Sequence, residues 1–175
     1  RSVFTSNQLH LQEQAQVEQQ MGSALGQWVA EIQKDRSRLE ALAFLDDLTG
    51  LANRRLFLER LDQALRNCRR NKSHMALVYL DLDRFKQLND SQGHHAGDLL
   101  LKEIAQRLQR AVREVDTAAR LGGDEFTLIL VDVQTEEGLA NQLTRLRNSL
   151  KTPLDILGHT VFPAASIGAA ISDGS

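Results

Sequence analysis

Four acidic residues stand beside apolar runs, at a spacing that could bind a cation or a phosphate. Asp124 and Glu125 follow two glycines. Asp81 and Asp83 end an apolar run that begins at Met75. Glycine adopts positive φ at low steric cost, so a Gly-Gly pair between two extended segments indicates a hairpin turn. Acids at a turn and at a strand end are within reach of a ligand, and the two pairs together predict a metal-dependent, nucleotide-binding site.

The residue types at this site also indicate which metal it would take. Side chains alternate between the two faces of a strand, so Asp81 and Asp83 point the same way and Leu82 points the other way. Carboxylates at a strand end and at a turn form an all-oxygen cage, which suits Mg²⁺ or Mn²⁺. The sequence contains neither a CxxC nor an HExxH pattern, so a zinc site is poorly supported.

Length and composition fit one domain with an appendage. The chain has 175 residues, is 42% hydrophobic and carries a net charge of −2, which indicates neither a nucleic-acid polymer nor an anionic membrane as partner. Its one cysteine, Cys68, excludes an internal disulfide and fits a reducing compartment. We find no signal peptide and no apolar run of about 20 residues, the length that a membrane helix needs. Since the chain starts at Arg1, we expect a cytoplasmic fragment, with attachment to the inner membrane through an upstream segment left open.

The hydrophobic pattern along the chain predicts alternating helices and strands. Strands that alternate with helices, with one hairpin, predict an α/β fold with a mixed sheet. We expect helices over 53–70, 98–113 and 136–151, a buried strand over 75–82, a hairpin around Gly122-Gly123 and an extended tail over 160–172.

Residues 1–45 predict a long N-terminal helix, because they are rich in Gln, Glu, Ala and Leu and lack proline. A period near 3.5 indicates a coiled coil from Met21 onward, interrupted at Asp35, so we expect this stalk to form dimers. The alternative is one amphipathic helix folded onto its own domain. The heptad seam comprises Phe4, Asn7, Leu11, Gln14, Glu18, Met21, Leu25, Trp28, Ile32, Asp35, Leu39 and Leu42.

Four segments in order, 47–55, 81–90, 93–98 and 120–126, resemble the motifs of the GGDEF family of diguanylate cyclases. The resemblance covers about residues 44 to 175. It implies a palm-like central sheet flanked by helices, as in nucleotide cyclases and polymerases. We therefore divide the chain into a stalk, 1–45, and a GGDEF domain, 46–175. Family members usually continue into a further helix with Lys and Arg near the triphosphate, so we expect this domain to lack its C-terminal end.

The resemblance assigns a metal role to Asp81, Asp124 and the main-chain carbonyl of Leu82. Glu125 takes the place of a further essential acid, either a metal ligand or a proton acceptor. Asp83 is left open, either as support for the metal site or as a cap for the segment that follows. The acids Asp124 and Glu125, with Lys86, are the expected catalytic residues.

The triphosphate and the base have candidate contacts of their own. Lys86 is the cation nearest the metal motif, and main-chain N–H groups of residues 84–86 could also bind phosphate. Family guanine contacts correspond to Asn89 and Asp98. The competing interpretation of Asp98 is an N-cap of a helix that starts at Leu99. His94 and His95 are interpreted as structural loop residues. The expected GTP-binding residues are Phe85, Lys86, Asn89, Asp98, Gly122 and Gly123.

A second nucleotide site is indicated by Arg113 and Asp116, which form an RxxD motif before the hairpin. In the family this spacing marks an inhibitory site for the cyclic product. The motif is common by chance, and an arginine at a helix C-terminus is stabilised by the helix dipole in any case.

The resemblance implies a diguanylate cyclase that condenses two GTP into cyclic di-GMP and two pyrophosphates. Each domain would hold one GTP, so we expect a homodimer that requires Mg²⁺ or Mn²⁺. The alternative is a non-catalytic receptor that binds GTP or cyclic di-GMP and signals through protein partners. The intact acids at positions 81, 124 and 125 favour the enzyme.

Overall fold

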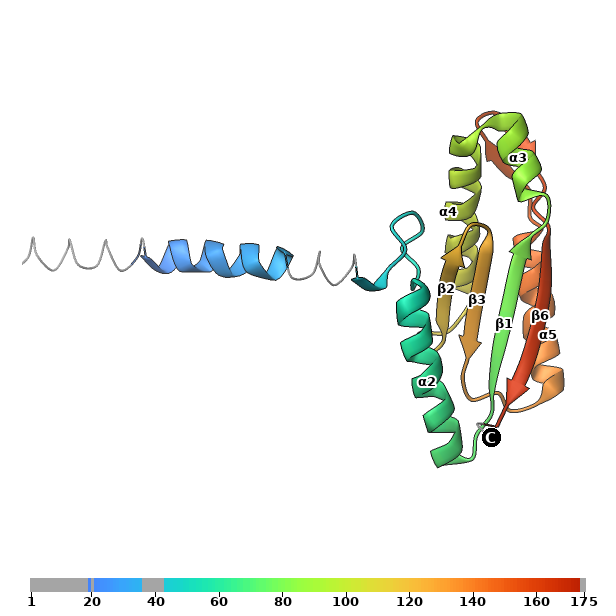
Figure 1. Ribbon diagram of the computed structural model, residues 1–175, viewed down its shortest axis with the longest axis horizontal. Coiled ribbons are helices and arrows are strands. Elements are labelled where there is room, and N and C mark those ends of the chain that lie inside the picture. The colour runs from blue at the N-terminus through green and yellow to red at the C-terminus, as the bar shows by residue number, and fades with distance from the viewer. Residues whose placement is uncertain (1–18, 20, 36–42, 174–175) are drawn as a thin grey trace, which may run out of the picture. The chain divides into compact units, whose positions relative to one another are not determined.

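The computed structural model describes residues 19, 21–35 and 43–173. The chain separates into two compact units, residues 1–42 and 43–175 (Figure 1). In the first unit residues 21–35 are helical. The second unit contains a four-stranded sheet in the order β2-β3-β1-β6 and a two-stranded sheet, β4-β5. Its elements are α2 (Arg54–Asn71), β1 (Met75–Leu82), α3 (Phe85–Gln92), α4 (His94–Ala111), β2 (Thr117–Gly122), β3 (Glu125–Leu130), α5 (Glu136–Leu150), β4 (Leu154–Ile156), β5 (His159–Val161) and β6 (Ala165–Ser172).

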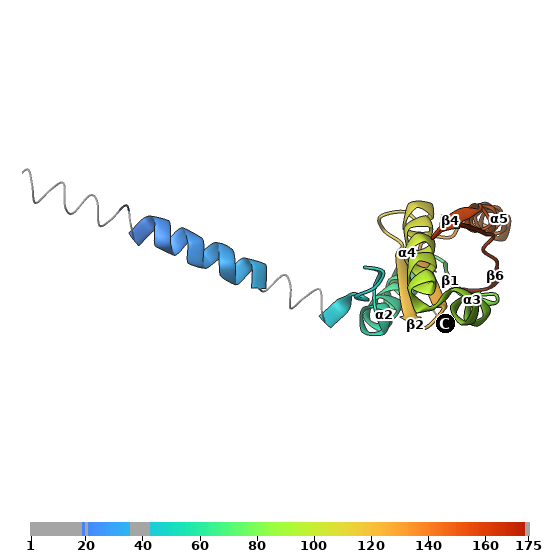
Figure 2. The ribbon, with the colours of Figure 1, turned by 90° about the horizontal axis from the view of Figure 1, so that it is seen from above.

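One face of the large sheet is sealed by α4 and α5 (Figure 2). Alternate residues of β1 point into this face and are at most 4% exposed. They pack against the apolar stripe of α4 and the inward leucines of α5, which form one continuous core. The β1 and β3 residues of this face are Ala76, Val78, Leu80, Leu82, Phe126, Leu128 and Leu130.

The opposite face is covered by α2 along part of its length. Met75 and Ile129 pack with Phe57, Ala64 and Cys68 of this helix in a second, smaller core. Asn53 caps α2: its Oδ1 accepts a hydrogen bond from the Leu56 N–H at 3.0 Å. Further along the same face of β1, the side chains of Tyr79 and Asp81 are exposed. At the end of β1 where the acids lie, one face of the sheet is therefore buried and the other is exposed.

The predicted α/β fold, with a central sheet flanked by helices, is confirmed. The predicted hairpin joins β2 to β3, and the helices expected over 53–70 and 136–151 are α2 and α5. The sheet differs from the mixed sheet expected, because β1–β3, β1–β6 and β2–β3 all pair antiparallel. Among the described residues, parallel pairing is limited to a bridge between Ala52 and Ala119.

The helix boundaries after β1 differ most from the prediction. α4 begins at His94, four residues before the predicted start at Asp98, and α3 was not predicted at all. Gly93, with φ 85°, ends α3 and precedes α4, so two helices meet where the glycines indicated a loop. His94 and His95 are consequently helical.

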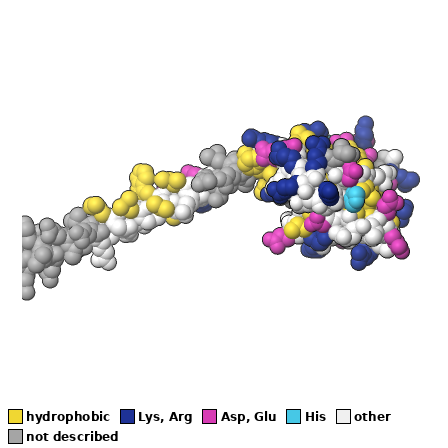
Figure 3. Space-filling model, turned by 90° about the horizontal axis from the view of Figure 1, so that it is seen from below, with side chains coloured by type: hydrophobic (Ala, Val, Ile, Leu, Met, Phe, Trp, Pro, Cys, Tyr) yellow, Lys and Arg dark blue, Asp and Glu magenta, His cyan; other side chains and the backbone are white. Residues whose placement is uncertain are grey.

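The described N-terminal helix exposes the apolar part of the predicted seam. Met21, Leu25, Trp28 and Ile32 are each at least 59% exposed. Figure 3 shows hydrophobic side chains gathered along this helix. The seam positions up to Glu18, and Leu39 and Leu42, lie outside the described residues. None of the helices described is long and apolar enough to cross a membrane.

Candidate active site

The acids of β1 and β3 meet at the part of the sheet that α2 leaves open. Asp81 pairs directly with Glu125 in the β1–β3 ladder. Because alternate residues of a strand share a face, Tyr79 lies on the same side as Asp81. Glu125 also interacts with the Tyr79 hydroxyl, and it is the main cause of the raised pKa of this tyrosine. The register thus brings together two acids that are 44 positions apart in the sequence and adds a tyrosine that the motifs did not predict.

Asp124 stands in the two-residue turn between β2 and β3, directly before Glu125. The turn requires glycine, since φ is 143° at Gly122 and 55° at Gly123. The Arg120 guanidinium donates two hydrogen bonds to the Gly123 carbonyl, from Nε at 2.9 Å and from Nη2 at 2.7 Å. The expected turn with its two acids is therefore present, next to the end of β1.

The clustered negative charge makes these acids a candidate cation site. Partial burial, followed by the charges of Asp124, Glu125 and Asp83, raises the pKa of Asp81 above its usual range. The hydrogen bond to Glu125, with burial and the nearby acids, raises the pKa of Tyr79 to about 12. Nearby negative charge contributes to both shifts, and a bound cation would offset this contribution.

The donor set fits magnesium or manganese. In the described part of the chain no three His, Cys, Asp or Glu side chains already form a metal cluster. Mg²⁺ does not need one, because it commonly binds through one or two carboxylates, substrate phosphates and water. Asp81 and Asp124 could supply the carboxylates. The Leu82 side chain is buried in the core, so this residue could contribute its main-chain carbonyl alone.

Beyond the acids, the chain turns sharply into α3. Arg84 has φ 62° and precedes the helix without a side-chain cap. The first N–H groups of a helix lack intrahelical acceptors, so those of Phe85 and Lys86 can bind an anion. The Lys86 side chain is exposed. Asp83 does not cap α3; its Oδ1 accepts a hydrogen bond from Ser166 Oγ at 2.8 Å, which ties it to β6.

The predicted base contacts lie on α3 and α4, which pack against each other at Gly97. Gly97 packs so closely on α3 that a Cβ atom there would overlap Asn89 Oδ1 and lie 3.1 Å from Phe85 Cζ. Asp98 follows on α4 and is half-buried. It cannot be the N-cap, because the helix begins four residues earlier. The structure therefore packs Phe85 and Asn89 against Gly97, places Asp98 at the next position of α4, and removes the capping alternative for Asp98.

Two amide oxygens in α3 lack partners. Asn89 Oδ1 and Gln92 Oε1 are buried without a hydrogen bond, which is costly for polar atoms. No α3 residue is fully buried. The helix that carries the predicted base contact Asn89 therefore contains two unsatisfied acceptors.

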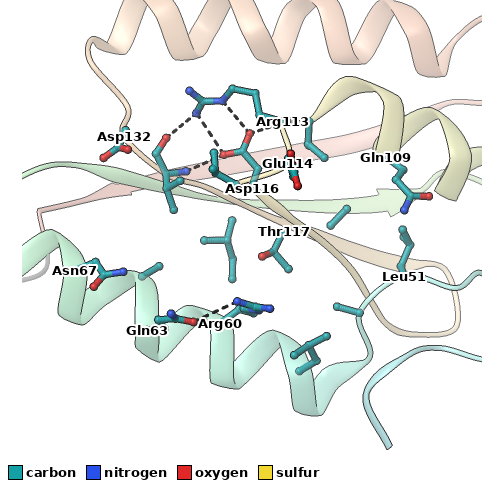
Figure 4. A pocket seen from close by; sticks show the side chains of 18 of the residues that line it. Leu51, Arg60, Gln63, Asn67, Gln109, Arg113, Glu114, Asp116, Thr117 and Asp132 are labelled. Atoms are coloured by element: carbon teal, nitrogen blue, oxygen red, sulfur yellow. Dashed lines mark hydrogen bonds and ion pairs between the residues drawn. The ribbon is translucent and has the colours of Figure 1, made fainter. Parts of the chain in front are cut away.

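The RxxD residues line a separate pocket of about 710 Å³, next to α2 (Figure 4). Arg113 donates to Asp116 from Nε at 3.2 Å and to the Val131 carbonyl from Nη2 at 2.6 Å. The Asp116 carboxylate also accepts hydrogen bonds from the N–H groups of Arg113 and Val131. Its side chain is 0% exposed, whereas that of Arg113 is 55% exposed. Asp116 thus joins the α4–β2 connection to the end of β3, and Arg113 is the member of the pair within reach of a ligand.

Sequence reasoning missed two residues beside the acids, Tyr79 and Asp46. A tyrosine two positions before Asp81 on a strand was a usable signal for the first. The role of Asp46 depends on Arg120, 74 positions away, and no local pattern indicates that pairing.

Comparison with known proteins identifies the family. Residues 43–175 match the family model described as diguanylate cyclase, GGDEF domain, so the chain belongs to the GGDEF family. It is 44% identical over 133 residues to the bifunctional diguanylate cyclase/cyclic di-GMP phosphodiesterase MucR of Pseudomonas aeruginosa, covering 76% of this chain and 19% of MucR. It is 37% identical over 148 residues to the diguanylate cyclase TpbB of the same species, covering 84% of this chain and 34% of TpbB.

Solved structures support the same family assignment. The GGDEF domain of TpbB matches with a TM-score of 0.70 and 38% identity, covering 73% of this chain and 74% of that chain. The coiled coil and GGDEF domain of DgcB from Caulobacter crescentus, in complex with c-di-GMP, matches with a TM-score of 0.73 and 29% identity, covering 87% and 83%. The chain spans between a fifth and a third of the length of MucR and TpbB.

Proposed function

We propose that this chain is a diguanylate cyclase that condenses two GTP molecules into cyclic di-GMP with release of two pyrophosphates. The observation that carries the proposal is the cluster of Asp81, Asp124 and Glu125 at the open end of the sheet. A chain that used this fold for binding alone would gain nothing from placing Asp124 and Glu125 where they, after burial, raise the pKa of Asp81. Family membership supports the same reaction.

In this proposal Asp81, Asp124 and the Leu82 carbonyl hold Mg²⁺ or Mn²⁺. When bound, the cation stabilises negative charge on the α-phosphate oxygens and on the attacking 3′ oxygen. Lys86 and the N–H groups at the start of α3 hold the triphosphate. Glu125, oriented by the Tyr79 hydroxyl, either completes the metal ligands or accepts the proton of the 3′-hydroxyl.

The base is held between α3 and α4. A carboxylate such as Asp98 can accept hydrogen bonds from the N1–H and exocyclic amino groups of guanine, and the Asn89 amide can donate or accept. Adenine presents a lone pair at N1 and would leave the carboxylate without a donor. These two side chains therefore favour GTP over ATP.

Two such domains must face each other, because each holds one GTP. The exposed seam of the N-terminal helix is the proposed means of pairing, and a parallel pair of stalks would keep the two domains at high effective concentration. Arg113 is the proposed phosphate contact for inhibitory cyclic di-GMP, and use of Asp116 by the ligand requires its internal hydrogen bonds to open.

The test is to incubate the chain with GTP and Mg²⁺ and to measure pyrophosphate and cyclic di-GMP together. We expect both products in a two-to-one ratio, loss of both with EDTA, and little product from ATP. Binding of GTP without either product would contradict the cyclase and support a nucleotide receptor.

A further inference from the structure

Arg120 links the turn that carries Asp124 to the segment where the chain enters the second unit. Its Nη1 donates to Asp46 Oδ1 at 3.0 Å and Oδ2 at 3.1 Å, while Nε and Nη2 donate to the Gly123 carbonyl. The Arg120 side chain is 12% exposed and that of Asp46 is 20% exposed. One planar guanidinium therefore uses three nitrogen atoms on two partners, and both are partly shielded from water.

The two glycines of this turn leave open space where a side chain would project. A Cβ atom added at Gly122 or at Gly123 would meet no atom within 4 Å. The ladder between β2 and β3 continues through Gly122 and Glu125, but it is irregular between Arg120 and Gly122. Within this turn, the hydrogen bonds from Arg120 restrain the Gly123 carbonyl, one residue before Asp124.

At the other end of the link, several hydrogen bonds hold Asp46 in place. Asp46 Oδ1 accepts hydrogen bonds from the Thr49 N–H at 2.9 Å and Thr49 Oγ1 at 2.6 Å. The Asp46 N–H donates to the Leu51 carbonyl at 2.8 Å. Burial alone would raise the pKa of Asp46, but its hydrogen bonds with Thr49 and Arg120 and the charge of Arg120 lower it.

The segment around Asp46 is itself tied to the sheet. The Arg120 N–H donates to the Ala52 carbonyl at 2.9 Å, and the Ala52 N–H donates to the Ala118 carbonyl at 3.2 Å. Asn53 Nδ2 donates to the Ala43 carbonyl at 3.1 Å. A continuous set of hydrogen bonds therefore runs from residue 43, the first of the second unit, to the turn before Asp124.

We propose that Arg120 is a positioning residue for the metal-binding turn and that Asp46 sets its orientation, so that the geometry of segment 43–53 controls the affinity of the site for its cation. The inference depends on the proposed function, because it assigns a metal ligand role to Asp124. It adds a regulatory path: a change in segment 43–53 moves the Arg120 guanidinium, and with it the turn.

The test compares Arg120→Lys and Arg120→Gln with the parent chain. Lysine keeps the charge but, with one nitrogen, cannot contact both partners in the same geometry. The matched control is Arg66→Lys on α2, since Arg66 makes a 2.6 Å ion pair with Asp62 while both side chains are more than 60% exposed. The readouts are the Mg²⁺ concentration for half-maximal turnover, the KM for GTP, the melting temperature, and Mn²⁺ binding by electron paramagnetic resonance.

We expect both Arg120 variants to need about tenfold more Mg²⁺, as the loss of a charge-assisted hydrogen bond predicts. Mn²⁺ binding should weaken to the same extent, while the KM for GTP at saturating Mg²⁺ changes by less than threefold and the control matches the parent. An unchanged metal requirement, or an equal loss of turnover at every Mg²⁺ concentration, would overturn the inference. If the parent binds Mn²⁺ tightly without turnover, the cyclase proposal fails, and weaker Mn²⁺ binding by the variants still supports the role of Arg120.

Discussion

The two faces of the central sheet use the same strands for different purposes. Toward α4, β1 and β3 present a continuous apolar surface that is at most 4% exposed. Toward α2, β1 begins with the apolar Met75 and then presents Tyr79 and Asp81, while the antiparallel β3 begins with Glu125 and ends with the apolar Ile129. The contrast shows how one strand can serve two roles. Packing on the buried face fixes the position of the backbone, and this fixed backbone keeps the mutually repelling acids close together on the open face.

The largest effect should follow from removing an acid on the open face. We expect Asp124→Asn or Asp81→Asn to lower turnover of GTP by at least about a thousandfold, because an amide removes the negative charge that holds the cation. Circular dichroism should remain that of the parent, since neither side chain belongs to the apolar core. The control is Asp62→Asn on α2, which also removes an exposed acid. Turnover within a few-fold of the parent would refute the two-carboxylate site.

A smaller effect should follow from disturbing the packing of α3 on α4. Gly97→Ala places a Cβ atom against Asn89 Oδ1 and Phe85, so the Asn89 side chain or α3 itself must shift. We expect the KM for GTP to rise about tenfold and the preference for GTP over ATP to fall. The matched control is Gly26→Ala in the N-terminal helix, where the new Cβ meets no atom within 4 Å. An unaltered KM would show that the base binds elsewhere.

The exposed seam of the N-terminal helix allows a test of pairing. We expect Leu25→Asn combined with Ile32→Asn to weaken self-association and to make specific activity depend steeply on protein concentration. Gln33→Asn is the control for a polar change on the same helix. Sedimentation and turnover should be followed over one concentration series. If the double variant and the parent behave alike, the seam does not form the dimer.

The smallest effect concerns the charge of Asp46. A carboxylate whose pKa is lowered by folding stabilises the native state above its unfolded pKa of about 3.9, and this contribution is lost as the pH falls through the lower folded value. We expect Asp46→Asn to cost about 1 kcal/mol at pH 7, allowing for solvent screening. Thermal melts from pH 7 to pH 3 should show the difference from the parent shrinking as the pH falls. A difference that grows toward low pH would contradict the assignment.

The local sequence pattern was sufficient to predict much of this fold. The helix after Asn53, the strand that ends at Asp81 and the Gly122-Gly123 hairpin each have a signal within a few residues, and all three are present. The start of α4 was misplaced because His94 and His95, which lie between Gly93 and Gly97, were interpreted as loop residues. Gly93 does separate two helices. Gly97 is helical, and its lack of a Cβ allows α3 to pack closely against it.

The contacts that complete the candidate site depend on long-range pairing. Asp81 and Glu125 become neighbours through the β1–β3 register, which the hydrophobic alternation leaves undetermined along the strand. The bond between Arg120 and Asp46 requires the entry segment to lie beside β2. A motif can indicate which residues matter, but the partner of each one follows from topology.

The most direct test of the account is to locate the metal. Crystals of the chain grown with GTP and Mn²⁺ should be measured at the manganese absorption edge. We predict an anomalous peak at coordination distance from the carboxylates of Asp81 and Asp124, with GTP phosphate oxygens completing its ligands. A peak elsewhere, or bound GTP without a peak at these acids, would contradict the assignment of the open face as a metal-dependent catalytic site.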